Sequence, residues 1–226
     1  KLGTPAILKT RRFGYDGKGQ VKIDRSADAK AAFDALKGAP AILEGFVPFE
    51  KEVSVIAARA PDGSFAAYDV GENDHRHHIL HTTTVPAALP AALADTAREM
   101  TRTLMDGLDY VGVIGVEFFI LPDGETGSRL CINEFAPRVH NSGHWPMAAC
   151  LVSQFEQHIR AICGWPLGST KRHSDAVMLN LIGTDVEAWS SHAATPDRSV
   201  HLYGKHDPRP GRKMGHVTTI YHRQDR

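Results

Sequence analysis

The sequence predicts an α+β fold in which antiparallel sheets are flanked by helices. Segments with apolar residues three and four positions apart, typical of amphipathic helices, are separated by short β-rich segments. Two pairs of β-rich segments are joined by Pro-Asp-Gly turns at residues 61–63 and 122–124. Such short turns favour β-hairpins, whose strands pair antiparallel, and this pairing gives the expected sheets their direction.

The expected elements alternate along the whole chain, without an internal repeat or a low-complexity tract. Helices are expected at residues 26–37, 90–106 and 147–163. Strands are expected at residues 6–9, 41–44, 52–59, 64–70, 111–121, 129–135, 176–182, 200–203 and 217–221.

Each expected helix has a start or a stop signal. Ser26 is a typical N-cap residue and Gly38 a typical C-terminal stop, so the first helix should turn Phe33 and Leu36 inward. The stop glycines and apolar stripes of the other two helices are Gly107 with Leu93, Ala97, Met100 and Leu104, and Gly164 with Leu151, Phe155, Ile159 and Ile162.

The composition is that of an ordinary globular protein, with 42% apolar and 23% charged residues among 226. The formal net charge of zero argues against a nucleic acid bound over a broad surface. No apolar run approaches the ~18 residues of a membrane-spanning helix, and no signal peptide is visible, so we expect a cytoplasmic protein. Cys131, Cys150 and Cys163 lack zinc-type spacing and are expected to be reduced, buried thiols.

A glycine-rich, basic segment follows the first strand, which ends at Lys9. Glycines let a backbone approach a ligand closely, and successive N–H groups can bind an anion, so a polyphosphate would fit. The alternative is a flexible basic hairpin turn. The candidate residues are Lys9, Gly14, Tyr15, Asp16, Gly17, Lys18, Gly19 and Gln20.

A second candidate, for a nucleoside, follows the strand at residues 41–44. Backbone groups and an apolar floor suit a base, and a carboxylate suits ribose hydroxyls. An exposed strand end is an equally good interpretation of this segment. The residues that could supply these groups are Glu44, Gly45, Phe46, Val47 and Glu52.

Two carboxylates face each other if the strands pair around a turn near residues 125 and 126, so that opposite residue numbers sum to 251. This register pairs Glu117 with Glu134, Phe119 with Ile132 and Leu121 with Leu130. Opposed carboxylates repel each other unless a proton or a cation lies between them, and oxygen ligands of this kind suit Mg²⁺. The alternative is a register slip that turns one glutamate to solvent. Strand alternation turns Asn133 to the opposite face.

These features together resemble the ATP-grasp superfamily and, within it, the N5-carboxyaminoimidazole ribonucleotide synthetase family. The resemblance covers essentially the whole chain and is carried by residues 8–20, 110–113, 133–145, 180–183 and 210–216. It implies an ATP-grasp fold with a small β-rich C-terminal domain. The implied division is an incomplete lid at residues 1–48, a catalytic core at 49–170 and the C-terminal domain at 171–226.

The resemblance also implies an activity. Family members are ligases that use MgATP and bicarbonate, through carboxyphosphate, to carboxylate 5-aminoimidazole ribonucleotide in purine biosynthesis. The product passes to a downstream mutase, and homodimers are common. Because the family's N-terminal domain would precede Lys9 and the chain lacks an initiator Met, we expect a piece of a longer protein.

The implied roles fall on matching positions. Glu117 and Glu134 hold Mg²⁺, while Arg138, Lys205 and Arg212 act in catalysis. The ATP residues are those of the two nucleotide segments above together with His75 and Asn133, and the bicarbonate and ribonucleotide residues are His140, Asn141 and Ser142.

Two other functions remain open at this stage: another ATP-grasp carboxylase or ligase, and a nucleotide-binding fragment without turnover. Lys213 is interpreted as a solvated neighbour of Arg212. The four histidines within residues 75–81 favour an exposed strand or loop over a native metal site.

Overall fold

The computed structural model describes residues 2–12, 14, 18–122 and 130–223. Contacts between Cα atoms divide the chain into two units. The N-terminal unit comprises Lys1–Pro48 with Arg76–Ile79, and the large unit comprises Phe49–His75 with Leu80–Arg226. No helix in the described part of the chain has the length and apolarity required to cross a membrane.

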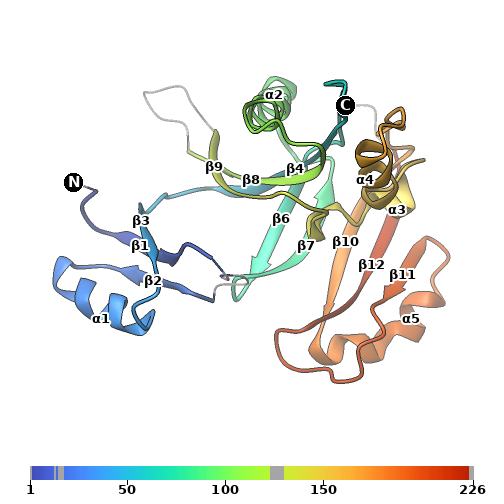
Figure 1. Cartoon of the computed structure of the whole chain (residues 1–226). Coiled ribbons are helices and arrows are strands. Elements are labelled where there is room, and N and C mark those ends of the chain that lie inside the picture. Colours follow the sequence, from blue (N-terminus) through green and yellow to red (C-terminus); the bar gives the residue numbers. More distant parts are fainter. Residues whose placement is uncertain (1, 13, 15–17, 123–129, 224–226) are drawn as a thin grey trace. The chain divides into compact units, whose positions relative to one another are not determined.

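The N-terminal unit is built on a three-stranded antiparallel sheet in the order β2-β1-β3 (Figure 1). Its core is small and joins Leu8 and Ile23 of the sheet to Ala32 and Leu36 of the helical segment. The elements are β1 (Ala6–Thr10), β2 (Gln20–Ile23), η1 (Ser26–Asp28), α1 (Ala29–Ala35) and β3 (Ala41–Gly45).

The first helix begins later than its sequence signals predict. Ser26 opens the 3-10 turn η1, and no side-chain cap forms there or at Asp28, so the prediction of Ser26 as N-cap is wrong. The residues turned to the sheet are four apart, Ala32 and Leu36, and this leaves Phe33 48% exposed instead of inward.

The large unit is built on one antiparallel sheet in the order β11-β12-β10-β7-β6-β4-β8-β9, with β5 paired to β4. Residues 171–226 lie within this unit, where β10–β12 extend the sheet, and their status as a separate domain stays a prediction. The strands are β4 (Lys51–Arg59), β5 (Phe65–Ala67), β6 (Gly71–Arg76), β7 (Ile79–Val85), β8 (Gly112–Ile120), β9 (Leu130–Ala136), β10 (Ser174–Ile182), β11 (Arg198–Leu202) and β12 (Lys213–His222). The helical elements are α2 (Ala91–Gly107), η2 (Asn141–Gly143), α3 (Pro146–Ala149), α4 (Gln154–Ile162), η3 (Gly183–Ala188) and α5 (Trp189–Ala193).

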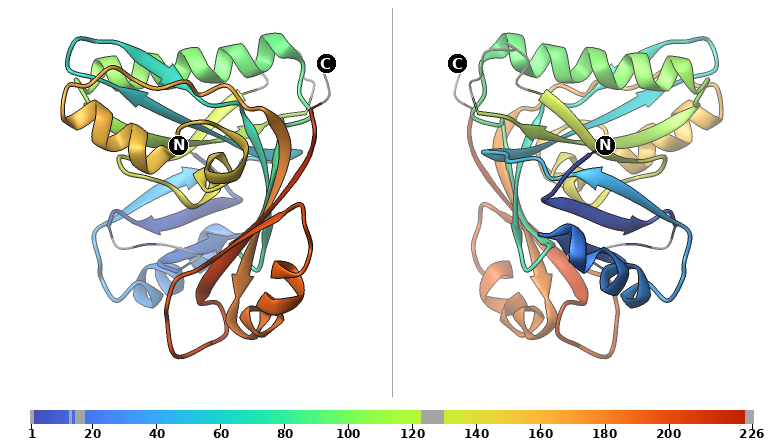
Figure 2. Two further views of the ribbon diagram at one scale, coloured as in Figure 1. Left: turned by 90° about the vertical axis from the view of Figure 1, so that its right-hand side faces the viewer. Right: turned by 90° about the vertical axis from the view of Figure 1, so that its left-hand side faces the viewer.

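The middle strands β4 and β8 separate two hydrophobic cores. Figures 1 and 2 show α2 lying along one face of these strands, where Val53, Val55 and Ala57 join its predicted stripe. Alternation turns Ile56 and Ala58 to the opposite face, against Trp145 and α3. The candidate site lies on this second face, because Glu52 and Ser54 share the alternation of Ile56.

The third predicted helix is two helices with a break between them. Cys150 is extended, at φ −130° and ψ 163°, and forms a β-bridge with Arg172. Ser153 then caps α4 by accepting a hydrogen bond from the Glu156 N–H. Cys163, expected to be buried, is exposed at the end of α4.

The predicted apolar stripe of that helix is also wrong, because α4 buries amides instead. Gln157 bonds both backbone groups of Gly168, and Gln154 bonds both backbone groups of His140. These two amides and Ala161 form the buried face of α4. The exposed residues are Leu151, Phe155, Ile159 and Ile162, all predicted to be inward.

Candidate functional site

The site starts from the pairing of Ser54 on β4 with Glu117 on β8. Directly opposite residues share a face of an antiparallel sheet, so both side chains lie on the second face. Gly115 shares this face, and a Cβ atom there would lie 2.6 Å from the Cβ of His140. The glycine therefore lets the loop after β9 lie directly against the sheet.

The predicted pairing of Glu117 with Glu134 is confirmed, but the register of the hairpin beyond it is not. A bulge at Asn133 shifts the pairing, so that Ile132 lies opposite Phe118 and not opposite Phe119. Leu130 accordingly pairs with Ile120 in place of Leu121. The extra residue in β9 breaks the strict alternation from which the face of Asn133 was predicted. Residues 123–129 lie outside the described residues.

Charge repulsion between the paired carboxylates favours the protonated form of Glu117. Burial and then the charge of Glu134 raise the pKa of Glu117 to about 7. A cation between the two carboxylates would relieve this repulsion. Two carboxylates completed by phosphate oxygens are a ligand set that suits Mg²⁺, so the residues present fit the predicted metal.

Glu52 and His75 meet across β4 and β6. The Nδ1 atom of His75 lies 2.8 Å from Oε2 of Glu52. Burial by itself would lower the pKa of His75, yet the hydrogen bond to Glu52 and the charges of Glu52 and Glu117 raise it. The structure thus brings together two residues that the sequence assigned separately to the nucleotide.

The loop after β9 turns its polar side chains to several partners. His140 approaches Glu117, with Nε2 lying 3.3 Å from Oε1. Burial and the charges of Arg138 and Lys213 lower the pKa of His140 to about 4. Arg138 itself is exposed and donates from Nη1 to the Val139 carbonyl.

Two other loop residues are held by protein groups. The Ser142 hydroxyl is fully buried and bonds to Ser54 and His140. Asn141 and the buried Asn180 on β10 exchange amide hydrogen bonds at 3.0 and 2.6 Å. The structure therefore directs both polar groups toward protein partners in the described residues.

Lys213 is a candidate functional residue that sequence reasoning missed. It is half-buried at the start of β12, and its charge acts on His75, Glu117 and His140, which favours a place in the site over the solvated position predicted for it. Alternation in β12 gives no signal for it, because residues 214–218 are all buried. The carboxylate cluster is defined as Glu52, His75, Glu117, Glu134, His140 and Lys213.

The two predicted basic residues of the tail, Lys205 and Arg212, both donate hydrogen bonds to backbone carbonyls. Lys205 is exposed and donates to the Lys213 carbonyl at 2.6 Å. Arg212 is half-buried and donates from Nη1 to the Asp207 carbonyl at 3.0 Å. Both hydrogen bonds hold the loop before β12.

The N-terminal unit carries its own share of the predicted nucleotide residues. Lys9 and Glu44 form an ion pair at 2.7 Å between β1 and β3, and Phe46 is 43% exposed just beyond β3. Gly19 has φ +75°, and a Cβ atom there would lie 2.6 Å from the Thr10 hydroxyl, so the turn requires glycine. Gly14, Lys18, Gln20, Gly45 and Val47 lie in this unit as well, while Tyr15, Asp16 and Gly17 lie outside the described residues.

A second group of rings lies beside the cluster in the large unit. His144 stacks on His216 with ring centroids 4.4 Å apart, and His201 also stacks on His216, at 5.3 Å. Tyr203 shares a hydrogen bond of 3.0 Å with Nδ1 of His216. Burial and neighbouring histidines lower the pKa of His144 to about 4 and that of His216 to about 3. The imidazole stack is defined as His144, His201, Tyr203 and His216.

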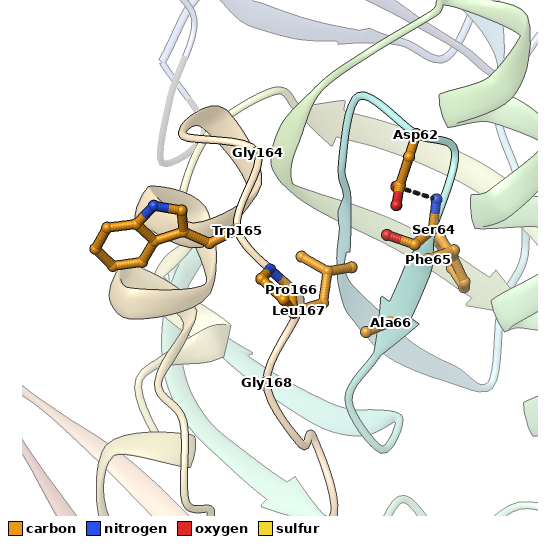
Figure 3. Close-up of a pocket in the computed structure, with 9 residues that line it drawn as sticks. All are labelled: Asp62, Ser64, Phe65, Ala66, Gly164, Trp165, Pro166, Leu167 and Gly168. Atoms are coloured by element: carbon orange, nitrogen blue, oxygen red, sulfur yellow. Dashed lines mark hydrogen bonds between the residues drawn. The ribbon is translucent and has the colours of Figure 1, made fainter.

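A histidine-containing turn and a surface pocket bring fewer reactive side chains together than the cluster does. His77 and His78 occupy the turn between β6 and β7 with positive φ of 51° and 64°, and in the described part of the chain no three metal-ligating side chains converge on one point. A pocket of about 400 Å³ lies between the β4–β5 turn and the segment after α4 (Figure 3). Its one carboxylate, Asp62, accepts from the Ser64 N–H, and the pocket shares no residue with the carboxylate cluster.

Comparison with known proteins points to the same protein family for both parts of the chain. The family model of the ATP-grasp domain matches residues 1–155, and that of the phosphoribosylaminoimidazole carboxylase C-terminal domain matches residues 176–226. An N5-carboxyaminoimidazole ribonucleotide synthase from Brucella melitensis is 57% identical over 97% of the chain. The chain spans 60% of that relative's length.

Solved structures agree. An ADP complex of an N5-carboxyaminoimidazole ribonucleotide synthetase is 44% identical and superposes with a TM-score of 0.89, over 97% of this chain and 58% of that one. The Aspergillus clavatus synthase in complex with ADP and 5-aminoimidazole ribonucleotide is 33% identical, with a TM-score of 0.87 over the same shares.

Proposed function

The chain belongs to the N5-carboxyaminoimidazole ribonucleotide synthase family of ATP-grasp proteins, and from this premise we propose that its protein carboxylates 5-aminoimidazole ribonucleotide. The reaction consumes ATP and bicarbonate and releases ADP and phosphate. The single observation that supports it best is the pairing of Glu117 with Glu134. That pair lies in a cluster with His140 and Lys213, where a triphosphate and a carbonate oxygen need charge neutralisation.

The proposed reaction has two steps. A bicarbonate oxygen attacks the γ-phosphorus of ATP, the bond to the β-phosphate oxygen breaks, and ADP leaves, which gives carboxyphosphate. Carboxyphosphate then breaks down to CO₂ and phosphate, and the exocyclic amine of the ribonucleotide attacks CO₂ and loses a proton. The product is N5-carboxyaminoimidazole ribonucleotide, which a downstream mutase would take up.

The cluster supplies positioning and charge rather than a covalent nucleophile. Glu117 and Glu134 would hold Mg²⁺, which neutralises phosphate charge when bound. Lys213 adds a positive charge, and Arg138 presents a planar guanidinium that can bind two oxygens of an anion. Lys205 and Arg212 are proposed to reach the ribonucleotide and carboxyphosphate.

The nucleotide residues are proposed within each unit. In the large unit, Glu52 and His75 form a hydrogen-bonded pair that suits ribose hydroxyls, and Asn133 is a further candidate at the bulge of β9. In the N-terminal unit, Lys9 and the glycine-rich segment are proposed to bind phosphates, and residues 44–47 the base. A homodimer and a cytoplasmic location stay predictions.

The decisive experiment measures ADP release by the full-length protein with MgATP and bicarbonate, with and without 5-aminoimidazole ribonucleotide. We expect release to depend on all three substrates. Turnover stimulated by a different amine or carboxylate, and not by this ribonucleotide, would identify another ATP-grasp ligase. Nucleotide binding without turnover would reject an enzymatic role.

A further inference from the structure

Two buried serine hydroxyls lie behind His140, on the side of the ring away from Glu117. The Ser142 hydroxyl lies 2.9 Å from Nδ1 of His140, and the Ser54 hydroxyl lies 2.8 Å from that of Ser142. Ser142 is fully buried and Ser54 is 2% exposed. A single row of polar groups therefore runs from Ser54 through Ser142 and His140 to Glu117.

The positions of the hydrogens along this row follow from Ser54. Within the part of the chain that the structure describes, Ser142 is the hydrogen-bonding partner of the Ser54 hydroxyl. A buried hydroxyl hydrogen without an acceptor is costly, so Ser54 donates to Ser142. The Ser142 hydrogen then has Nδ1 of His140 as its acceptor, and Nδ1 must be the unprotonated nitrogen.

The opposite arrangement leaves a buried hydrogen without a partner. If Nδ1 carried hydrogen, it would donate to Ser142, and Ser142 would donate to Ser54. The Ser54 hydrogen would then have no acceptor among the described residues. Both the Nδ1–H form and the doubly protonated form of His140 have this defect, whereas the Nε2–H form satisfies every group.

We propose that the Ser54–Ser142 hydroxyl pair holds His140 in the Nε2–H form, so that the ring presents a hydrogen-bond donor to the reacting groups. Nε2 and Oε1 of Glu117 are 3.3 Å apart, slightly longer than the ~2.7–3.2 Å of a usual N–H···O bond. The N–H can thus be shared with an anionic oxygen such as that of a bound carbonate. At this atom the ring donates a hydrogen bond and does not accept a proton. Ser54 and Ser142 are positioning residues, since both act through His140.

The hydrogen placement is tested without any substrate. In protein labelled with ¹⁵N-histidine, two-bond ¹H–¹⁵N correlations show which ring nitrogen carries hydrogen, and His140→Gln identifies the signals. We expect hydrogen on Nε2 of His140 in the wild type. Hydrogen on Nδ1, or on both nitrogens, at neutral pH would overturn the proposal.

Variants then test the role of Ser54. In Ser54→Ala the constraint on Ser142 is removed, so we expect a second, Nδ1–H population, while Ser54→Thr keeps the hydroxyl and the single form. Thr101→Val is the matched control, because it removes a fully buried hydroxyl that bonds the Ala97 carbonyl within α2. Unchanged His140 signals in folded Ser54→Ala would contradict the proposal.

The kinetic consequence rests on the proposed function and is measured separately in the full-length protein. We expect Ser54→Ala to lower kcat about 10- to 100-fold, the range produced by loss of a group that orients a metal-bound histidine. KM for ATP should stay unchanged, and Ser54→Thr should restore kcat. Failure of the carboxylation assay with the predicted NMR result would reject the proposed function alone. Normal kcat in Ser54→Ala with a mixed ring form would reject the catalytic importance of the hydroxyl pair.

Discussion

The carboxylate cluster contains ionisable groups of both signs, whereas the imidazole stack contains histidine rings and a phenol. In the cluster, the pKa of Glu117 is raised to about 7 by burial and by Glu134, while Lys213 acts in the opposite direction. In the stack, burial lowers the pKa of His144 and His216 to about 4 and about 3, so both rings are neutral at pH 7.

His140 and His144 show how one loop serves both regions. Four residues apart, His140 lies against Gly115 and Glu117, and His144 stacks between Phe155 and His216. The cluster keeps unbalanced charge that a ligand could neutralise, whereas two rings of the stack, His144 and His216, are held neutral. The difference indicates that the first region is arranged for binding and the second for packing.

The largest effect on turnover is expected at the paired carboxylates of the cluster. Glu134→Gln removes one carboxylate of the proposed metal pair, so turnover with MgATP should fall about 100-fold or more, while the fold is kept. The pKa of Glu117 should move toward its ordinary value, because Glu134 raises it. Kinetics of the full-length protein and carboxyl ¹³C NMR measure the two effects.

The control for that prediction is Glu99→Gln, an exposed carboxylate on α2. It should change neither turnover nor the Glu117 titration. Near-normal turnover in Glu134→Gln would show that the pair does not hold a metal, and the contrast between cluster and stack would lose its functional meaning.

Lys213 gives the next largest effect, because its charge is the one that reaches most members of the cluster. Lys213→Met should lower kcat about 10-fold, the factor produced by a loss of ~1.4 kcal/mol of transition-state stabilisation. The pKa of Glu117 should rise further, since the lysine lowers it. Lys171→Met, at an exposed position, is the matched control, and equal rates in the two variants would restore the interpretation of Lys213 as a solvated residue.

The pairing of Glu117 with Glu134 could be predicted from the sequence, although the extra residue at Asn133 contributes to it: opposite residue numbers sum to 250 nearer the turn and to 251 at the two glutamates. The register beyond them could not, since the bulge at Asn133 leaves no mark in a pattern of period two. β6 and β7 were missed for a related reason. Their polar side chains, such as Asn73 and His75, face the site and other strands instead of following a half-buried pattern.

The break between α3 and α4 was hidden by a regular apolar stripe. Leu151, Phe155 and Ile159 have helical spacing, yet the buried face is set by the amides of Gln154 and Gln157. Each amide bonds both backbone groups of a residue 11 or 14 positions away, a relation that no local pattern shows.

A smaller effect on stability should distinguish the cluster from a region built for packing. The folded pKa of Glu117, about 7, lies above its ordinary 4.5, so the metal-free folded state binds a proton more tightly than the unfolded state. The resulting stabilisation is present at low pH and is lost as pH rises through about 7. Glu117→Gln should therefore raise Tm by a few degrees at pH 8 and change it little at pH 5, in EDTA, even though turnover is lost.

Thermal denaturation across this pH range checks that prediction, with Glu99→Gln as the control. A Tm difference that does not depend on pH would show that ionised Glu117 does not destabilise the folded protein. In that case the loss of stability caused by a buried negative charge would not distinguish the cluster from the stack.

The smallest effect concerns the stack and has the opposite dependence on pH. The folded pKa of His144, about 4, lies below its ordinary 6.5, so between these values the unfolded state binds more protons and stability falls as pH falls. His144→Phe removes this titration and a buried Nδ1 that has no hydrogen-bond partner in the described residues, and it keeps a ring to stack on Phe155 and His216. The loss of Tm between pH 7.5 and pH 5 should be smaller by a few degrees in the variant than in the wild type, and His206→Phe, at an exposed position, should behave as the wild type. Equal losses in His144→Phe and the wild type would mean that the folded protein accepts a charge at His144, and the stack would then resemble the cluster.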